Sequence, residues 1–294
     1  MQTQIKMQNL KFKSLFFRKL KNGLFSIFSF FAVASSLFLI GWILFEIIKN
    51  GAGAISWGFL TNPSKPYGIP DAGISNAIIG TVLITFTAAA ISIAPAMLAG
   101  IYLAEFGKNK KHAGAIRFGA NVMMGIPSIL VGLFVYMAVV VPSGNFSGLA
   151  GAIALAIIMF PIIMRTTEDM MAMVPNHLRE ASLALGMTKT RSTLGIVCRS
   201  AKNGLITGIL LAIARVSGET APLLFTALFC DDYIQNFLSQ PTANMPVLIA
   251  EYATNSPFEE MHKSAWGASL IIILAILAIN VSTRILLREK KNGH

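Results

Sequence analysis

The sequence predicts an all-α membrane protein with six transmembrane helices. Of its 294 residues, 54% are hydrophobic and only 13% are charged, and the mean hydropathy is +0.66. A soluble domain carries roughly 25% charged residues. The charges also cluster, which leaves six apolar runs, most of them near the ~20 residues that cross a bilayer as a helix. This composition indicates a polytopic membrane protein.

The expected spans follow the apolar runs along the chain. They cover residues 24–48, 74–103, 119–141, 149–164, 204–228 and 266–287. The fourth run is short for a bilayer, and the second is long enough to tilt. The first run could be taken for a signal peptide, because Ala32-Val33-Ala34 resembles a cleavage site. Its apolar residues continue to Ile48, so we expect a retained span.

Basic residues give these spans an orientation. Twenty of the 24 Lys and Arg residues lie in segments that six spans place on one side, namely 6–21, 108–117, 165–202 and 284–291. The positive-inside rule then puts both termini in the cytoplasm. The leader, residues 1–23, is either an amphipathic helix on the membrane surface or a disordered basic flank.

Composition also argues against other classes of protein. The net charge of +11 agrees with the positive-inside rule, and no basic patch sits on a soluble domain, so we expect no nucleic-acid binding. Cys198 and Cys230 fall on opposite sides of the predicted membrane, and the four histidines are scattered. We therefore expect neither a disulfide nor a metal site.

Prolines lie within or at the edges of the spans, at Pro95, Pro127, Pro161 and Pro222. Proline removes a backbone donor and bends a helix, and in lipid the freed carbonyls need protein neighbours or a wet cavity. Close helix packing around small residues explains these positions. The functional alternative is a gated, kinked pathway with hinges at Pro95, Pro127, Gly218 and Pro222.

The loop before the fifth span predicts two short helices joined by a sharp turn. Asn176 follows Pro175 and can cap the first helix, and Gly186 lies where that helix would end on a left-handed residue. Thr188 can cap the second helix. The apolar face of this segment has no partner within so short a loop. It therefore either rests on lipid or fits a groove of another protein.

This loop resembles the EAA loop of ABC importer permeases, whose pattern is Glu-Ala-Ala-x3-Gly-x9-Ile-x-Leu-Pro. The matching positions are Glu180, Ala181, Ser182, Gly186 and Ile196. Ser182 replaces the second alanine, and Cys198-Arg199 replaces Leu-Pro, which affects where the second short helix ends. The resemblance implies that residues 174–199 dock into a cytoplasmic ATPase and transmit its motion.

The sequence contains no Gly-x4-Gly-Lys-Ser/Thr phosphate loop. We therefore expect a non-catalytic subunit whose ATP is hydrolysed by another polypeptide. On this interpretation the chain binds no cofactor, and ATP and Mg²⁺ belong to the partner ATPase.

More of the chain resembles the PstA-type permeases of phosphate importers. The matching stretches are Gly73-Ile74, Gly80-Thr81, YLAEF (102–106), GIPSILVGL (125–133), VPNHLREASLALG (174–186) and ARVSGETAPLLFTA (214–227). The resemblance implies the type I importer permease fold over 24–288, a cytoplasmic tail at 289–294 and a bacterial inner-membrane location. It also implies inorganic phosphate as substrate, with a PstC-type second permease, two ATPase copies and an external phosphate-binding protein as partners.

Arg215 lies near the centre of the expected fifth span, where insertion scales give an arginine a cost of about 2.5 to 3.5 kcal/mol. Glu219 is four residues further and would share its helix face. The pair is either an internal ion pair that lowers the cost of burial, or a site where Arg215 meets phosphate and Glu219 moderates its field. Ser217 and Thr220 add hydroxyls to the candidate pathway.

Two alternative functions remain from the sequence. A permease for another oxyanion, sulfate or molybdate, would share most of these features. An ion-coupled secondary transporter would usually show internal repeats, and we find no convincing repeat.

Overall fold

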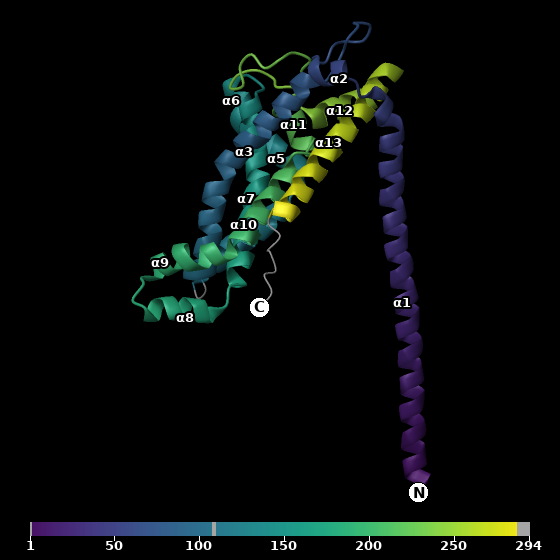
Figure 1. The fold of residues 1–294 in the computed structure, drawn as a ribbon, viewed down its shortest axis with the longest axis vertical. Helices are drawn as coiled ribbons and strands as arrows, with labels where there is room; N and C mark the ends of the chain where they lie inside the picture. Colours follow the sequence, from purple (N-terminus) through teal and green to yellow (C-terminus); the bar gives the residue numbers. More distant parts are fainter. Residues whose placement is uncertain (1, 108–109, 287–294) are drawn as a thin grey trace. The chain divides into compact units, whose positions relative to one another are not determined.

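A computed structural model describes residues 2–107 and 110–286, together with their side chains apart from those of residues 2–17, 20, 283 and 286. Every regular element in this part of the chain is a helix (Figure 1). The expected tail, 289–294, lies outside the described residues. So do the basic residues Lys108, Arg288, Lys290 and Lys291.

Five described helices are long and apolar enough to cross a membrane. They are Lys21–Ala54, Ser75–Phe106, Gly148–Ala172, Lys189–Val216 and Glu259–Ser282. A bent pair, Lys111–Gly125 with Ser128–Ser143, becomes a sixth span if it is counted as one. The number of candidate spans is therefore five or six, and the uncertainty falls on the third expected span.

Helix α1 (Gln2–Gly51) supplies the first span and belongs to a unit of its own. The helix continues without a break through the expected boundary between leader and span at residue 23. Nearly all side chains from 24 to 48 are exposed, with Phe28 at 72%. An apolar surface of this extent needs lipid or protein as its neighbour.

The rest of the chain, from Gly51, forms the second unit. Its long helices are α3 (Ser75–Ile101), α7 (Gly148–Ala172), α10 (Cys198–Val216) and α13 (Glu259–Leu286). Its shorter helices are α2 (Trp57–Thr61), α4 (Lys111–Gly125), α5 (Ser128–Val135), α6 (Val141–Ser143), α8 (Asn176–Ala184), α9 (Lys189–Ser192), α11 (Ala221–Leu224) and α12 (Met245–Thr254). Within this unit α8 and α9 lie together at one end, away from α2, α6 and α12 (Figure 1).

The core of this unit is the packing of α3 against α7. Alanines fill much of it, including Ala88 and Ala152, which are fully buried. A Cβ on Gly100 of α3 would come within 2.5 Å of the Met164 carbonyl oxygen of α7. Small residues allow this close approach of two backbones, as membrane helix interfaces commonly require.

The third expected span, 119–141, is not one continuous helix. Helices α4 and α5 meet at 100°, and Ile126 between them is extended, with φ −73° and ψ 129°. Pro127 follows directly, and a residue before proline is pushed out of the helical region. The proline predicted as a kink therefore breaks the helix.

The fourth expected span, 149–164, is too short. Helix α7 continues to Ala172, and the carboxylate beyond Met164 has two ion-pair partners. Glu168 accepts hydrogen bonds from Arg165 of the same helix at 2.8 Å and from Arg117 of α4 at 2.5 Å. Arg117 and Arg165, which the sequence placed in loops, lie within helices.

The fifth expected span, 204–228, is shifted. The span covers Lys189–Val216, and the chain then turns at Ser217 and Gly218 before the short helix α11. Leu223 and Thr226 beyond the turn are buried. This stretch is apolar because protein surrounds it, and a non-helical backbone at such a depth is tolerated only in that setting.

Candidate functional site

Arg215 and Glu219 line one cavity of about 250 Å³. The opposite wall is the break between α4 and α5 around Pro127, and Ile158 and Ile162 of α7 complete the lining. Among the described residues that line this cavity, Arg215 and Glu219 are the charged ones. The volume is many times the ~15 Å³ that one water requires.

Arg215 is held at the end of a long helix. It lies in the last turn of α10, where the negative end of the helix dipole favours a cation. At 1.5 Å per residue, the helix carries Arg215 about 20 Å beyond the exposed Lys202. If Lys202 lies at the membrane surface, Arg215 lies within a hydrocarbon layer of about 30 Å.

The ion pair between Arg215 and Glu219, one of the two interpretations that the sequence left open, is not formed. Within the described part of the chain, Arg215 makes no salt bridge to any carboxylate and its side chain has no hydrogen bond. The reason is that α10 ends at Val216, so Glu219 does not lie one turn further on the same helix. The guanidinium is exposed and Glu219 is half-buried.

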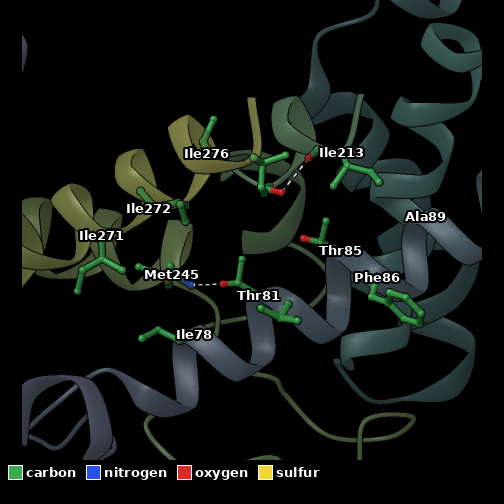
Figure 2. Close-up of a pocket in the computed structure, with 14 residues that line it drawn as sticks. Ile78, Thr81, Thr85, Phe86, Ala89, Ile213, Met245, Ile271, Ile272 and Ile276 are labelled. Carbon is green, nitrogen blue, oxygen red and sulfur yellow. Dashed lines mark hydrogen bonds between the residues drawn. The ribbon is translucent and has the colours of Figure 1, made fainter. Parts of the chain in front are cut away.

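The other two pathway candidates lie elsewhere. Ser217 lines a second cavity of about 290 Å³, where isoleucines of α13 face Thr81 and Thr85 of α3 (Figure 2). Its hydroxyl donates to the Ile213 carbonyl at 2.8 Å. Thr220 lines neither of these two cavities. Of the four candidates, the structure brings together Arg215 and Glu219.

The expected hinge residues occupy three kinds of position. Pro95 lies inside α3 and does not end it, and Pro161, which was not an expected hinge, likewise lies inside α7. Pro127 caps α5 at the 100° break. Gly218 lies in the turn after α10, and Pro222 is buried in the first turn of α11. Pro127, Gly218 and Pro222 thus mark the two breaks, whereas Pro95 is part of a continuous helix.

The predicted helical hairpin is present as α8 and α9 (residues 176–192). Gly186 has a φ of +80°, as expected for a left-handed turn. Thr188 caps α9, with its hydroxyl accepting from the Arg191 amide at 3.4 Å. Asn176 is not the cap of α8: Pro175 holds that position, and no side chain caps the helix.

The residues that match the EAA pattern differ in their exposure to solvent. Glu180 and Ala181 are exposed, Ile196 is half-buried and Ser182 is buried. The Ser182 hydroxyl lies 2.5 Å from that of Ser192 and donates to the Arg179 carbonyl at 2.7 Å. The serine that replaces alanine in the EAA pattern therefore links α8 to α9.

The departure at Cys198-Arg199 also has a structural consequence. Residues Thr193–Val197 form a π-helical turn, and α10 begins directly at Cys198. Because no proline interrupts the chain here, α9, the π turn and α10 form one candidate span.

Sequence reasoning missed the residues that attach the hairpin. Glu105, at the end of the Ser75–Phe106 span, is buried and forms an ion pair with Arg179 of α8 at 2.7 Å. A carboxylate among apolar residues at the end of a span was the available signal.

A broken helix pair and the end of α10 enclose a charged cavity among helices that can span a membrane, an arrangement typical of a membrane transport component. Residues 96–288 match the family described as "Binding-protein-dependent transport system inner membrane component". The chain is 16% identical to a chain of the inward-facing MetNI methionine ABC transporter, with a TM-score of 0.62 over 73% of this chain and 94% of the other. This likeness confirms the all-α type I ABC importer permease fold.

Curated relatives narrow the family further. The chain is 42% identical to the phosphate transport system permease protein PstA of Haemophilus influenzae, over 97% of this chain and 99% of the relative. It is 42% identical to PstA of Yersinia pestis over 94% and 92% of the two chains. A probable PstA of Methanocaldococcus jannaschii is 39% identical over 84% and 86%. The chain belongs to the family of these PstA permeases, among the inner membrane components of binding-protein-dependent transport systems.

Proposed function

We propose that this chain is the transmembrane permease subunit of an ATP-driven importer of inorganic phosphate. The observation that carries the proposal is the guanidinium of Arg215, which has no carboxylate partner among the described residues and lies at the cavity between the α4–α5 break and the end of α10. An arginine placed deep in a membrane protein without a carboxylate partner is available to an anion in transit. Its planar fork of N–H donors suits the oxygens of phosphate.

Glu219 lets this cavity distinguish phosphate from other oxyanions. A carboxylate repels any anion, but phosphate at neutral pH still carries at least one proton and can donate it to a carboxylate in a hydrogen bond. Sulfate at the same pH has no such proton. The pair therefore favours a protonated oxyanion and keeps its binding weak enough for release. This argues against the sulfate and molybdate alternative.

The α8–α9 hairpin supports coupling to an ATPase. Two of its large apolar side chains are exposed, Leu183 at 48% and Leu185 at 85%, as expected of a segment that fits a partner's groove. In the proposed complex, a PstC-type permease completes the pathway and an ATPase dimer binds ATP and Mg²⁺. An external phosphate-binding protein delivers the substrate. The hairpin and both termini are then cytoplasmic, and the membrane is the bacterial inner membrane.

The test is ATP-dependent uptake of labelled phosphate by the assembled complex in vesicles. Native complex is compared with Arg215→Ala and Arg215→Lys, and Lys202→Ala, an exposed cation of the same helix, is the matched control. We expect Ala to abolish uptake, Lys to restore part of it, and the Lys202 variant to transport normally.

Assembly of each variant is checked by co-purification, so that loss of uptake reports on transport. Normal uptake by Arg215→Ala would remove Arg215 from the pathway. A native complex that moves sulfate or molybdate but no phosphate would overturn the substrate while leaving the permease assignment intact.

A further inference from the structure

Residues Tyr102–Phe106 form a π-helical turn that ends the α3 span. The turn contacts three other elements. Glu105 forms an ion pair with Arg179 of α8. The centre of the Phe106 ring lies 4.8 Å from the ammonium of Lys189 of α9. The Tyr102 hydroxyl lies 2.5 Å from Nε2 of His112 of α4.

Arg179 is the firmest of these attachments. Its Nε and Nη2 donate to one oxygen of Glu105 at 3.0 and 2.7 Å. Nη2 also donates to the Met171 carbonyl at 2.8 Å, and Nη1 donates to the Val174 carbonyl. Carbonyls at the end of a helix have no partner within it, so one side chain ties α8 to α3 and to the end of α7.

The surroundings make this attachment stiff. The side chains of Arg179 and Glu105 are only 13% and 6% exposed. Ala104, Met171 and Val197 form a buried apolar cluster next to them. In apolar surroundings, separating a charged pair is costly, so the two residues move together.

We propose that Glu105 and Arg179 form the joint through which the α8–α9 hairpin moves the spans. A force on the hairpin passes through Arg179 to α3 and to the end of α7, and α7 carries Ile158 and Ile162 into the wall of the Arg215 cavity. Both act as positioning residues and touch no substrate. This inference rests on the proposed function, because it assigns a role within the coupling of ATP hydrolysis to transport.

The experiment measures phosphate transported per ATP hydrolysed by assembled complexes in vesicles. The variants are Glu105→Gln, Arg179→Gln and the double variant. Glu168→Gln is the matched control, since Glu168 is an equally buried carboxylate whose ion pairs are with Arg117 of α4 and Arg165 of α7 rather than with a hairpin residue. We expect each single variant to hydrolyse ATP but to transport at least tenfold less phosphate per ATP.

The double variant should lose no more than either single variant, since either change opens the same joint. The Glu168 variant should keep the native ratio. A native ratio in Glu105→Gln and Arg179→Gln, or an equal loss in Glu168→Gln, would overturn the proposal. If Glu105→Gln does not assemble, Arg179→Lys replaces it, because lysine keeps the charge and loses the fork that reaches three acceptors.

Hydrogen exchange of the hairpin amides in the full complex gives a readout that needs no phosphate. Opening the joint should speed exchange over residues 176–192 at least tenfold in the Glu105 and Arg179 variants, and leave it unchanged in the Glu168 variant. If native complex transports no phosphate, the proposed function fails on its own. Unchanged exchange in the joint variants would then overturn the joint separately.

Discussion

Gly132 of α5 lies directly against Pro222 of α11: a Cβ on Gly132 would come 2.6 Å from the Cα of Pro222. Each residue belongs to one of the two interrupted helices that face the Arg215 cavity. Because Gly132 has no side chain, the backbones of α5 and α11 can lie this close together.

Gly132→Ala should push α5 away from α11 and distort the cavity. Overpacking of this kind costs about 1 to 3 kcal/mol, and the nearest atoms here are backbone, which yields less than a side chain. We expect a lower melting temperature of the complex and a loss of phosphate uptake. Gly114→Ala in α4 is the matched control, because a Cβ there meets nothing within 4 Å. Equal behaviour of the two variants would count against this packing argument.

Glu219→Gln should weaken discrimination between phosphate and sulfate. Glutamine keeps the size of the side chain and removes the charge that repels an aprotic dianion. A charged hydrogen bond contributes about 1.5 to 3 kcal/mol, so sulfate should inhibit phosphate uptake at least tenfold more effectively. Ser128→Ala, at the same cavity, changes a polar group without changing charge. Sulfate inhibition that stays at the native level in Glu219→Gln would remove Glu219 from selectivity.

Gly186→Ala should strain the turn between α8 and α9. The φ of +80° at Gly186 is a region that other residues rarely adopt, and the left-handed conformation costs an alanine about 1 to 2 kcal/mol. We expect less phosphate transported per ATP, with the protein still in the membrane. At Gly195 an added Cβ makes only an ordinary contact with Met187, at 3.9 Å. Gly195→Ala should therefore couple normally, and a Gly186 variant that does the same would contradict the prediction.

Asp231 should make stability depend on pH. Burial has the largest effect and raises the pKa of the Asp231 carboxyl. A hydrogen bond from Ser64 lowers that pKa, and the negative charges of Asp232 and Glu251 raise it. One of its oxygens is buried without a hydrogen-bond partner among the described residues. The neighbouring Tyr252 has its pKa raised to about 12, mainly by burial, and stays neutral throughout.

Because the folded pKa of Asp231 is above the unfolded value, the folded state binds more protons between the two. Stability therefore falls as pH rises from the unfolded pKa through the folded pKa, and the deficit persists above it. Asp231→Asn should raise the melting temperature at neutral pH and leave it unchanged at a pH below both values. Thermal melting across acidic to neutral pH tests this, with the exposed Asp232→Asn as control. A constant difference between native and Asp231→Asn at every pH would refute the prediction.

The site was only partly predictable, as its two charged residues show. Arg215 was identified as a candidate site residue because a charge inside an apolar span is costly and is therefore usually functional. Its relation to Glu219 was wrong, because the spacing of four residues has a meaning only on a continuous helix, and α10 ends between them. The attachment of the hairpin by Glu105 and Arg179 joins residues 74 positions apart, and no local pattern encodes a contact of that range.

By itself the sequence determined the class of protein and its local signals. Apolar runs locate spans because lipid excludes unpaired polar groups, and Gly186 and Thr188 mark the hairpin turn because their chemistry suits a left-handed residue and a helix cap. Only the tertiary structure decided where the spans break. The stretch around Leu223 is as apolar as a span, but it is buried in protein, and composition cannot distinguish a surface that meets lipid from one that meets protein.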